Sequence, residues 1–180
     1  MIRVFFAVIF SVVSYALAQQ MPEKCATHTH QLTLLQQHPE INNELERINV
    51  LIQELKANQS VAKNEQVIIT IPVVVHVVYN TTAQNVSDAM ILNQLAVLNA
   101  DYGGTNSDLS SLPSVFSGIK AGNTGIQFCL AQRDPSGNAT TGIVRKSTTS
   151  TSFIDDDKVK NSSTGGDNAW DATKYLNIWL

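Results

Sequence analysis

Histidine, cysteine and clustered aspartate are the side chains of this 180-residue sequence that could bind a metal or act in catalysis. Two imidazoles reach one zinc ion when an H-E-x-x-H sequence places both on one face of a helix, and that motif is absent from the sequence. His28 and His30 could point to one side of an extended segment, but no third ligand stands near them in the sequence. We therefore expect a solvated segment there, and neither a catalytic nor a metal-binding residue in this chain.

His76 and the run Asp155–Asp157 have structural interpretations. His76 lies in a valine-rich stretch on the same face as Val74 and Val78, which predicts a hydrogen-bonded structural histidine. The three adjacent aspartates point in different directions, and no calcium loop with a distal glutamate follows them, so a charged surface turn is expected. Phosphate-loop and G-x-S-x-G motifs are absent as well.

The two cysteines lie in different contexts. Cys25 belongs to a polar segment before the first predicted strand, whereas Cys129 lies in the middle of a predicted strand. A disulfide between them would tie the polar segment to a buried strand, which we do not favour. We expect Cys129 to be a small buried hydrophobe or the partner of a cysteine outside this chain.

Composition and charge exclude some partners. Hydrophobic residues make up 43% of the chain and charged residues 15%, so the chain can bury a core. The net charge is −3 and the twelve basic residues are scattered, which argues against a nucleic-acid partner.

The first 18 residues have the pattern of a secretory signal peptide. A positive charge at Arg3 precedes the apolar run Val4–Val13, and Ala16-Leu17-Ala18 forms a small-x-small cleavage site. We expect cleavage after Ala18, a secreted, extracellular product and no membrane association afterwards.

The next segment, residues 19–65, is polar and contains one amphipathic stretch. Apolar residues recur at helical spacing between Ile41 and Leu55, which predicts a helix over Glu40–Lys56 with an apolar face that must lie on something. Asn58–Gln66 is a polar linker and the first credible domain boundary.

Residues 66–180 have an α/β pattern. A helix that begins after Ser87 presents Ile91, Leu95 and Leu98 as its buried stripe. Asp101–Asn123 has a loop-like composition, and Ser147–Gly166 reads as a solvated surface excursion. A largely parallel, twisted sheet with one backing helix is expected. Its strands are predicted at Val67–Tyr79, Ile126–Gln132, Gly142–Lys146 and Tyr175–Leu180, with a tight turn at Asp134–Gly137 between the second and the third.

The last predicted strand is apolar up to Leu180, and no turn residue, cap or polar tail follows it. Such a strand would leave a hydrophobic element uncovered, so we expect the sequence to be truncated. A natural C-terminal strand, paired centrally in the sheet, is the alternative.

Several sequence blocks, in order, carry a resemblance to a known family. They are Ile71–Tyr79, Val86–Ala89, Gln94–Asp101, Phe128–Ala131 with Asp134-Pro135, Gly142–Arg145 and Gly165–Leu180. These blocks resemble the pappalysin family of metzincin zinc metalloproteases, with ulilysin- and cytophagalysin-like members the most similar. The resemblance implies an α/β (α+β) fold in which residues 66–180 form the N-terminal part of a metalloprotease catalytic domain, ending before the H-E-x-x-H helix.

The resemblance also gives the polar segment a meaning. Residues 19–65 would be a propeptide, with Cys25 as the cysteine-switch zinc ligand of the parent zymogen. Lys63 is the only basic residue of the polar linker Asn58–Gln66, so we expect processing there. The family motif Cys-Gly-Thr appears here as Cys25-Ala26-Thr27, so the glycine is replaced.

The full-length parent would be a zinc endopeptidase, with calcium as a further ion and proteins or peptides as substrates. The chain itself would bind no cofactor and would be inactive. The alternative is a non-catalytic secreted binding module that kept the metzincin strands. A folded product with a protected last strand would favour that alternative.

Overall fold

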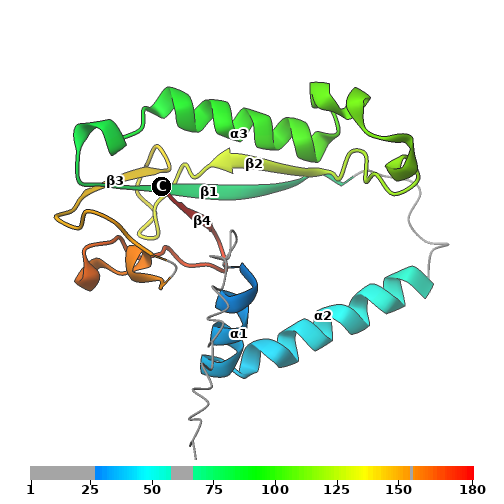
Figure 1. The fold of residues 1–180 in the computed structure, drawn as a ribbon, viewed down its shortest axis with the longest axis horizontal. Helices are drawn as coiled ribbons and strands as arrows, with labels where there is room; N and C mark the ends of the chain where they lie inside the picture. The colour runs from blue at the N-terminus through cyan, green and yellow to red at the C-terminus, as the bar shows by residue number, and fades with distance from the viewer. Residues whose placement is uncertain (1–26, 58–66, 155) are drawn as a thin grey trace, which may run out of the picture.

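The computed structural model describes residues 27–57, 67–154 and 156–180. The predicted signal peptide with its cleavage site at Ala18, together with Cys25 and Lys63, lies outside these residues. Figure 1 shows a helix covering one face of a sheet, with two further helices on the other side of it.

The sheet is organised around one long strand. Strand β1 (Ile69–Tyr79) pairs in parallel with β2 (Ile126–Leu130), β3 (Ile143–Ser147) and β4 (Leu176–Trp179). The predicted parallel sheet is therefore confirmed, and each strand lies within two residues of its predicted ends. Val73, Val74, Val75, His76 and Val77 are buried, as expected for a strand that is covered on both faces.

Backbone hydrogen bonds place the partner strands on the two edges of β1. The carbonyl of Val73 accepts from the N–H of Ala131 after β2, and the N–H of Val75 donates to Gly142 before β3. The carbonyl of His76 instead accepts from the N–H of Leu180 after β4. Because alternate residues direct their backbone groups to opposite edges, β2 and β3 lie end to end along one edge and β4 lies on the other (Figure 1).

Gly142 allows the chain to return to the same edge of β1 after the turn that follows β2. Its φ is +73°, and a Cβ atom there would lie 2.7 Å from the backbone nitrogen of Ala131. A side chain would therefore meet both backbone strain and a steric clash.

Helix α3 (Asp88–Gly103) covers one face of the sheet. Ser87 caps it by accepting a hydrogen bond from the N–H of Met90, as predicted, and Gly104 ends it in the left-handed conformation. Asn99 fixes α3 against β2, since its amide donates to the carbonyl of Phe128 at 2.9 Å and accepts from its N–H at 2.7 Å. The buried core cluster comprises Val73, Val75, Val77, Ile91 and Phe128, with Leu95 and Leu98 packed against it.

The opposite face of β1 is contacted by residues 148–175, which connect β3 to β4 and which we term the cover segment. The sequence predicted a solvated excursion up to Gly166, and most of its side chains are exposed. The segment nevertheless folds back on itself, because the N–H of Asp167 donates to the carbonyl of Val159 at 2.9 Å. Gly166 is buried in this fold, and a Cβ atom there would lie 2.1 Å from the oxygen of Val159.

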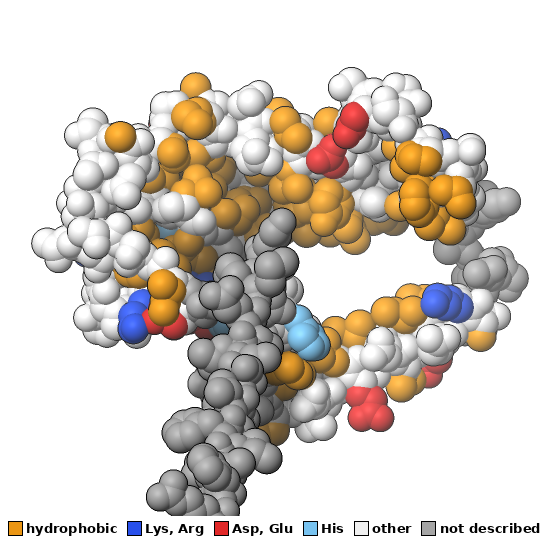
Figure 2. Space-filling view, in the orientation of Figure 1, with side chains coloured by type: hydrophobic (Ala, Val, Ile, Leu, Met, Phe, Trp, Pro, Cys, Tyr) orange, Lys and Arg blue, Asp and Glu red, His pale blue; other side chains and the backbone are white. Residues whose placement is uncertain are grey.

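Two helices precede the sheet. Helix α2 (Glu40–Ala57) confirms the predicted amphipathic helix. Helix α1 (Thr27–Gln37) was not expected, and the extended segment suggested for His28 and His30 is wrong because both lie on this helix. Neither helix has a buried residue. The apolar residues of α2 thus lack the cover expected for them within the described chain, and Figure 2 shows them facing an open space below the sheet.

Candidate functional site

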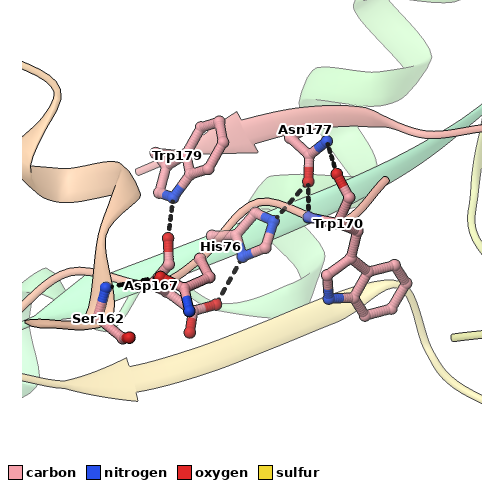
Figure 3. Close-up of polar contacts among 7 residues, drawn as sticks. His76, Ser162, Asp167, Trp170, Asn177 and Trp179 are labelled. Atoms are coloured by element: carbon pink, nitrogen blue, oxygen red, sulfur yellow. Dashed lines mark hydrogen bonds and ion pairs between the residues drawn. The ribbon is translucent and has the colours of Figure 1, made fainter. Parts of the chain in front are cut away.

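His76 is the fully buried polar residue of the described chain, with 0% of its surface exposed. Its Nδ1 atom lies 2.6 Å from Oδ2 of Asp167, in the cover segment. Its Nε2 atom lies 3.0 Å from Oδ1 of Asn177, in β4. The ring therefore joins three elements: its own strand β1, the cover segment and β4 (Figure 3).

Asn177 extends this network along the backbone. Its Oδ1 atom also accepts from the N–H of Trp170 at 2.7 Å. Its Nδ2 atom donates to the carbonyls of Trp170 and Tyr175, at 3.0 and 3.3 Å. The side chain thus pairs with the end of the cover segment as a strand would, and it holds β4 against that segment.

Both tryptophans of the chain contact the His76 ring. The Trp179 ring stacks on it with centroids 4.8 Å apart and planes 13° apart. Trp170 meets it edge-on at 6.4 Å. The Nε1 atom of Trp179 donates to the backbone carbonyl of Asp167 at 3.0 Å, which ties β4 to the cover segment a second time.

This cluster is suited to positioning rather than to chemistry on a substrate. His76 is sealed from solvent, and no buried side-chain nitrogen or oxygen of the described residues lacks a hydrogen-bond partner. The sequence correctly predicted a structural role for His76 but did not identify Asp167 or Asn177 as its partners. An asparagine within the apolar strand Tyr175–Leu180 was the one available signal.

A second contact joins α1 to the cover segment. Nε2 of His30 lies 3.3 Å from Oδ2 of Asp157, and the two side chains are 27% and 39% exposed. Both border a cleft of about 280 Å³ that is also lined by Thr33 and Leu34. Asp157 has a φ of +60°, which aspartate tolerates better than most residues, and it also pairs with Lys160 at 2.5 Å.

Asp156 carries a neighbouring negative charge. A hydrogen bond from the Lys158 ammonium holds the pKa of Asp156 below its ordinary value. The side of the cleft that faces His30 therefore carries two carboxylates, each paired with a lysine. Of the run Asp155–Asp157, Asp156 and Asp157 pair with lysines in a surface turn, as predicted, and Asp155 lies outside the described residues.

The structure contradicts one of the two predictions made for Cys129. It is a free thiol with an exposed residue surface, so the prediction of a buried hydrophobe is wrong. The alternation of β2 explains the error: Phe128 takes the core-facing position, and Cys129 therefore points away from α3. A pairing with a cysteine outside this chain remains a prediction.

The residues that the structure describes do not form a metal centre. They contain no group of three or more histidine, cysteine, aspartate or glutamate side chains that could hold an ion. They also contain no helix that is long and apolar enough to cross a membrane.

Solved structures of one protease resemble this chain, whereas no protein-family model and no curated protein matches it. Mirolysin in complex with a small compound is 54% identical over 63% of this chain and 42% of its own, with a TM-score of 0.60. Mature mirolysin of Tannerella forsythia with a cleaved peptide is 54% identical over 62% and 42%, with a TM-score of 0.59. A mutant of Tannerella forsythia promirolysin is 44% identical over 81% and 48%, with a TM-score of 0.60.

The chain thus spans less than half the length of the solved chains that it matches. Its parallel sheet with helices is consistent with part of a metzincin-like domain that follows a helical propeptide region. Its structural neighbours are a metzincin-family, pappalysin-like metalloprotease and the pro-form of that enzyme.

Proposed function

We propose that this chain is the N-terminal part of a secreted zinc metalloendopeptidase zymogen of the pappalysin family. The observation that carries the proposal is the identity of 54% to mature mirolysin over 62% of the chain, with a similar fold. The described residues offer no zinc site, so they supply the sheet and its backing helix, and the metal ligands would come from a later part of the parent. Zinc in such enzymes polarises the scissile carbonyl and acidifies a water molecule.

The propeptide boundary is supported by the difference between the two kinds of match. The match to promirolysin covers 81% of the chain, against 62% for mature mirolysin. If residues 19–65 are a propeptide, the pro-form of a related enzyme should match more of this chain than its mature form does. The mature enzyme would then begin near residue 66, and residues 1–18 would be the secretory signal.

An activity assay tests the proposal. The product of the complete reading frame should hydrolyse casein, and a zinc chelator should abolish that hydrolysis. The 180-residue chain alone should show no hydrolysis with or without added zinc. The mirolysin structure with a cleaved peptide supports proteins or peptides as the substrates of the parent. Chelator-sensitive hydrolysis by the isolated chain would contradict this account.

Processing would occur at Lys63, the single basic residue of the polar linker Asn58–Gln66. Substitution of Lys63 by Gln should prevent a Lys/Arg-specific activating protease from producing the mature N-terminus, as read by N-terminal sequencing. Lys56→Gln, at the exposed end of α2, is the matched control and should leave processing unchanged.

Cys25 would be the latency residue of the zymogen, since a thiolate is a good zinc ligand. Replacing Cys25 by Ser in the full-length zymogen should raise its activity before processing. Replacing the exposed Cys129 by Ser should not. Equal effects of the two substitutions would show that Cys25 has no special role.

A non-catalytic secreted binding module built on the metzincin strands is the competing proposal. A protected last strand in an isolated, folded product would favour it. In the described structure Leu180 is 52% exposed, although its backbone pairs with β1. Solubility of the isolated chain therefore separates the two proposals less sharply than the activity of the complete product.

A further inference from the structure

We infer that His76 donates from both ring nitrogens, to Asp167 and to Asn177, and that this positively charged ring fastens the cover segment and β4 to β1. The proposed protease function assigns no role to this residue. The inference concerns residues of this chain alone and holds whether or not the parent is a protease.

The orientation of the Asn177 amide fixes one proton of the ring. Its Oδ1 atom faces the N–H of Trp170, and its Nδ2 atom faces the carbonyls of Trp170 and Tyr175. In a flipped amide, the NH₂ group would face the N–H of Trp170, and the oxygen would face the two carbonyl oxygens. The neighbouring backbone groups therefore determine the orientation. Because Asn177 Oδ1 can only accept, the Nε2 atom of His76 must carry a hydrogen and donate it.

The other ring nitrogen faces a carboxylate. Nδ1 of His76 and Oδ2 of Asp167 are 2.6 Å apart, a contact that requires a proton between them because two bare lone pairs would repel. An imidazole nitrogen is a stronger base than a carboxylate oxygen, so the shared proton belongs on Nδ1. With hydrogens on both nitrogens, the His76 ring carries a positive charge.

The aromatic surroundings suit a cation. The Trp179 ring stacks on the His76 ring, and the face of an indole attracts positive charge. From the cover segment, the charged groups near the ring are Asp167 at Nδ1 and Lys160, whose Nζ lies 5.8 Å from the centroid of the Trp179 ring. The register neighbours of His76 on β3 and β4 are neutral, Val144 and Trp179.

Burial makes each member of this pair depend on the other. Asp167 is 21% exposed at its side chain, whereas His76 has no exposure. Removal of either charge would leave the other uncompensated in a site from which water is excluded.

Loss of the Asp167 carboxylate would act on two elements at once. The backbone of Asp167 donates to Val159 within the cover segment and accepts from the indole of Trp179 in β4. Displacement of Asp167 would therefore loosen the cover segment and β4 together.

Nuclear magnetic resonance of the unmodified full chain tests the charge directly. Two-bond ¹H–¹⁵N spectra of the histidine rings at neutral pH should show hydrogens on both nitrogens of His76. A bare nitrogen on His76 at neutral pH would overturn the inference.

Tryptophan fluorescence supplies a second test, because both tryptophans of the chain contact His76. Asp167→Asn removes the compensating charge, so the cover segment and β4 should loosen and the tryptophan emission should move toward that of solvent-exposed indole. Asp157→Asn, in the same segment but paired with His30, is the matched control and should leave the emission unchanged. An equal response of the two variants, or none in Asp167→Asn, would contradict the role of the pair.

Discussion

The N-terminal helices and the sheet with α3 are stabilised in different ways. Helices α1 and α2 contain no buried residue, and their stabilising contacts include the local ion pair between Arg47 and Glu44. The core cluster lies on β1, β2 and α3, and His76 is sealed on the other face of β1. The comparison teaches that residues 27–57 contribute no buried residue to the core, which is compatible with the propeptide proposed for them.

Each region has one histidine that contacts an aspartate of the cover segment, and the two contacts differ in burial. His76 and Asp167 meet at 2.6 Å with the ring fully buried. His30 and Asp157 meet at 3.3 Å with both side chains partly in solvent. Water screens the second contact but not the first. The two contacts should therefore differ several-fold in what they contribute to the free energy of unfolding.

The largest expected effect follows from removal of the buried ring. His76→Ala should lower the free energy of unfolding by roughly 3–5 kcal/mol, because it leaves Asp167 and Asn177 without their partner. His30→Ala should change it by less than about 1 kcal/mol. Urea unfolding followed by circular dichroism measures both values. Equal losses would break the comparison between the two regions.

The return of the chain to β1 at Gly142 should give the next effect. Gly142→Ala combines a positive φ with a Cβ atom 2.7 Å from the backbone of Ala131, and it should cost about 3 kcal/mol. Gly137→Ala has a positive φ but no atom within 4 Å of the new Cβ, so it should cost about 1 kcal/mol. Urea midpoints of the two variants separate the clash from the backbone strain.

The clamp between α3 and β2 should have an intermediate effect. Asn99→Ala leaves the N–H and the carbonyl of Phe128 without their side-chain partner, and should cost about 1–3 kcal/mol. Asn93→Ala makes the same change at an exposed site of the same helix, so it controls for helix propensity. A similar loss in both variants would show that the clamp contributes nothing.

The smallest effect is expected at the exposed turn after β2. The backbone N–H of Asn138 donates to Asp134 and holds the pKa of that carboxyl below its ordinary value. A lowered pKa in the folded state stabilises the fold above the ordinary value and loses that effect as pH falls through the lowered one. Asp134→Asn should therefore reduce the loss of stability as pH falls below about 4, with Asp101→Asn as the control.

Local patterns predicted most of the sheet. The valine-rich run of β1 and the capping residue Ser87 each specify their own element, and all four strands appear where the sequence placed them. The error at Cys129 concerned which face of β2 it occupies. That face depends on the pairing of β2 with β1 and α3, which periodicity over five residues does not determine.

The buried cluster was less predictable because its members are far apart in the sequence. His76 and Asp167 are separated by 91 positions, and His76 and Asn177 by 101. Nothing in the composition of the cover segment, rich in serine and aspartate, marks Asp167 as different from its neighbours. The sequence showed that His76 needed partners, and the fold of the cover segment selects them.

The central claim is that this chain begins a zinc endopeptidase, and the gene beyond the codon for Leu180 tests it most directly. Two further strands and their connections should place an H-E-x-x-H motif about 30 residues downstream, or up to about 60 with insertions, on a helix that follows an apolar strand. Sequencing that finds the motif there, in a product whose proteolysis a chelator abolishes, is the predicted result. A stop codon directly after Leu180, in a transcript that yields a soluble and folded protein, would contradict the claim.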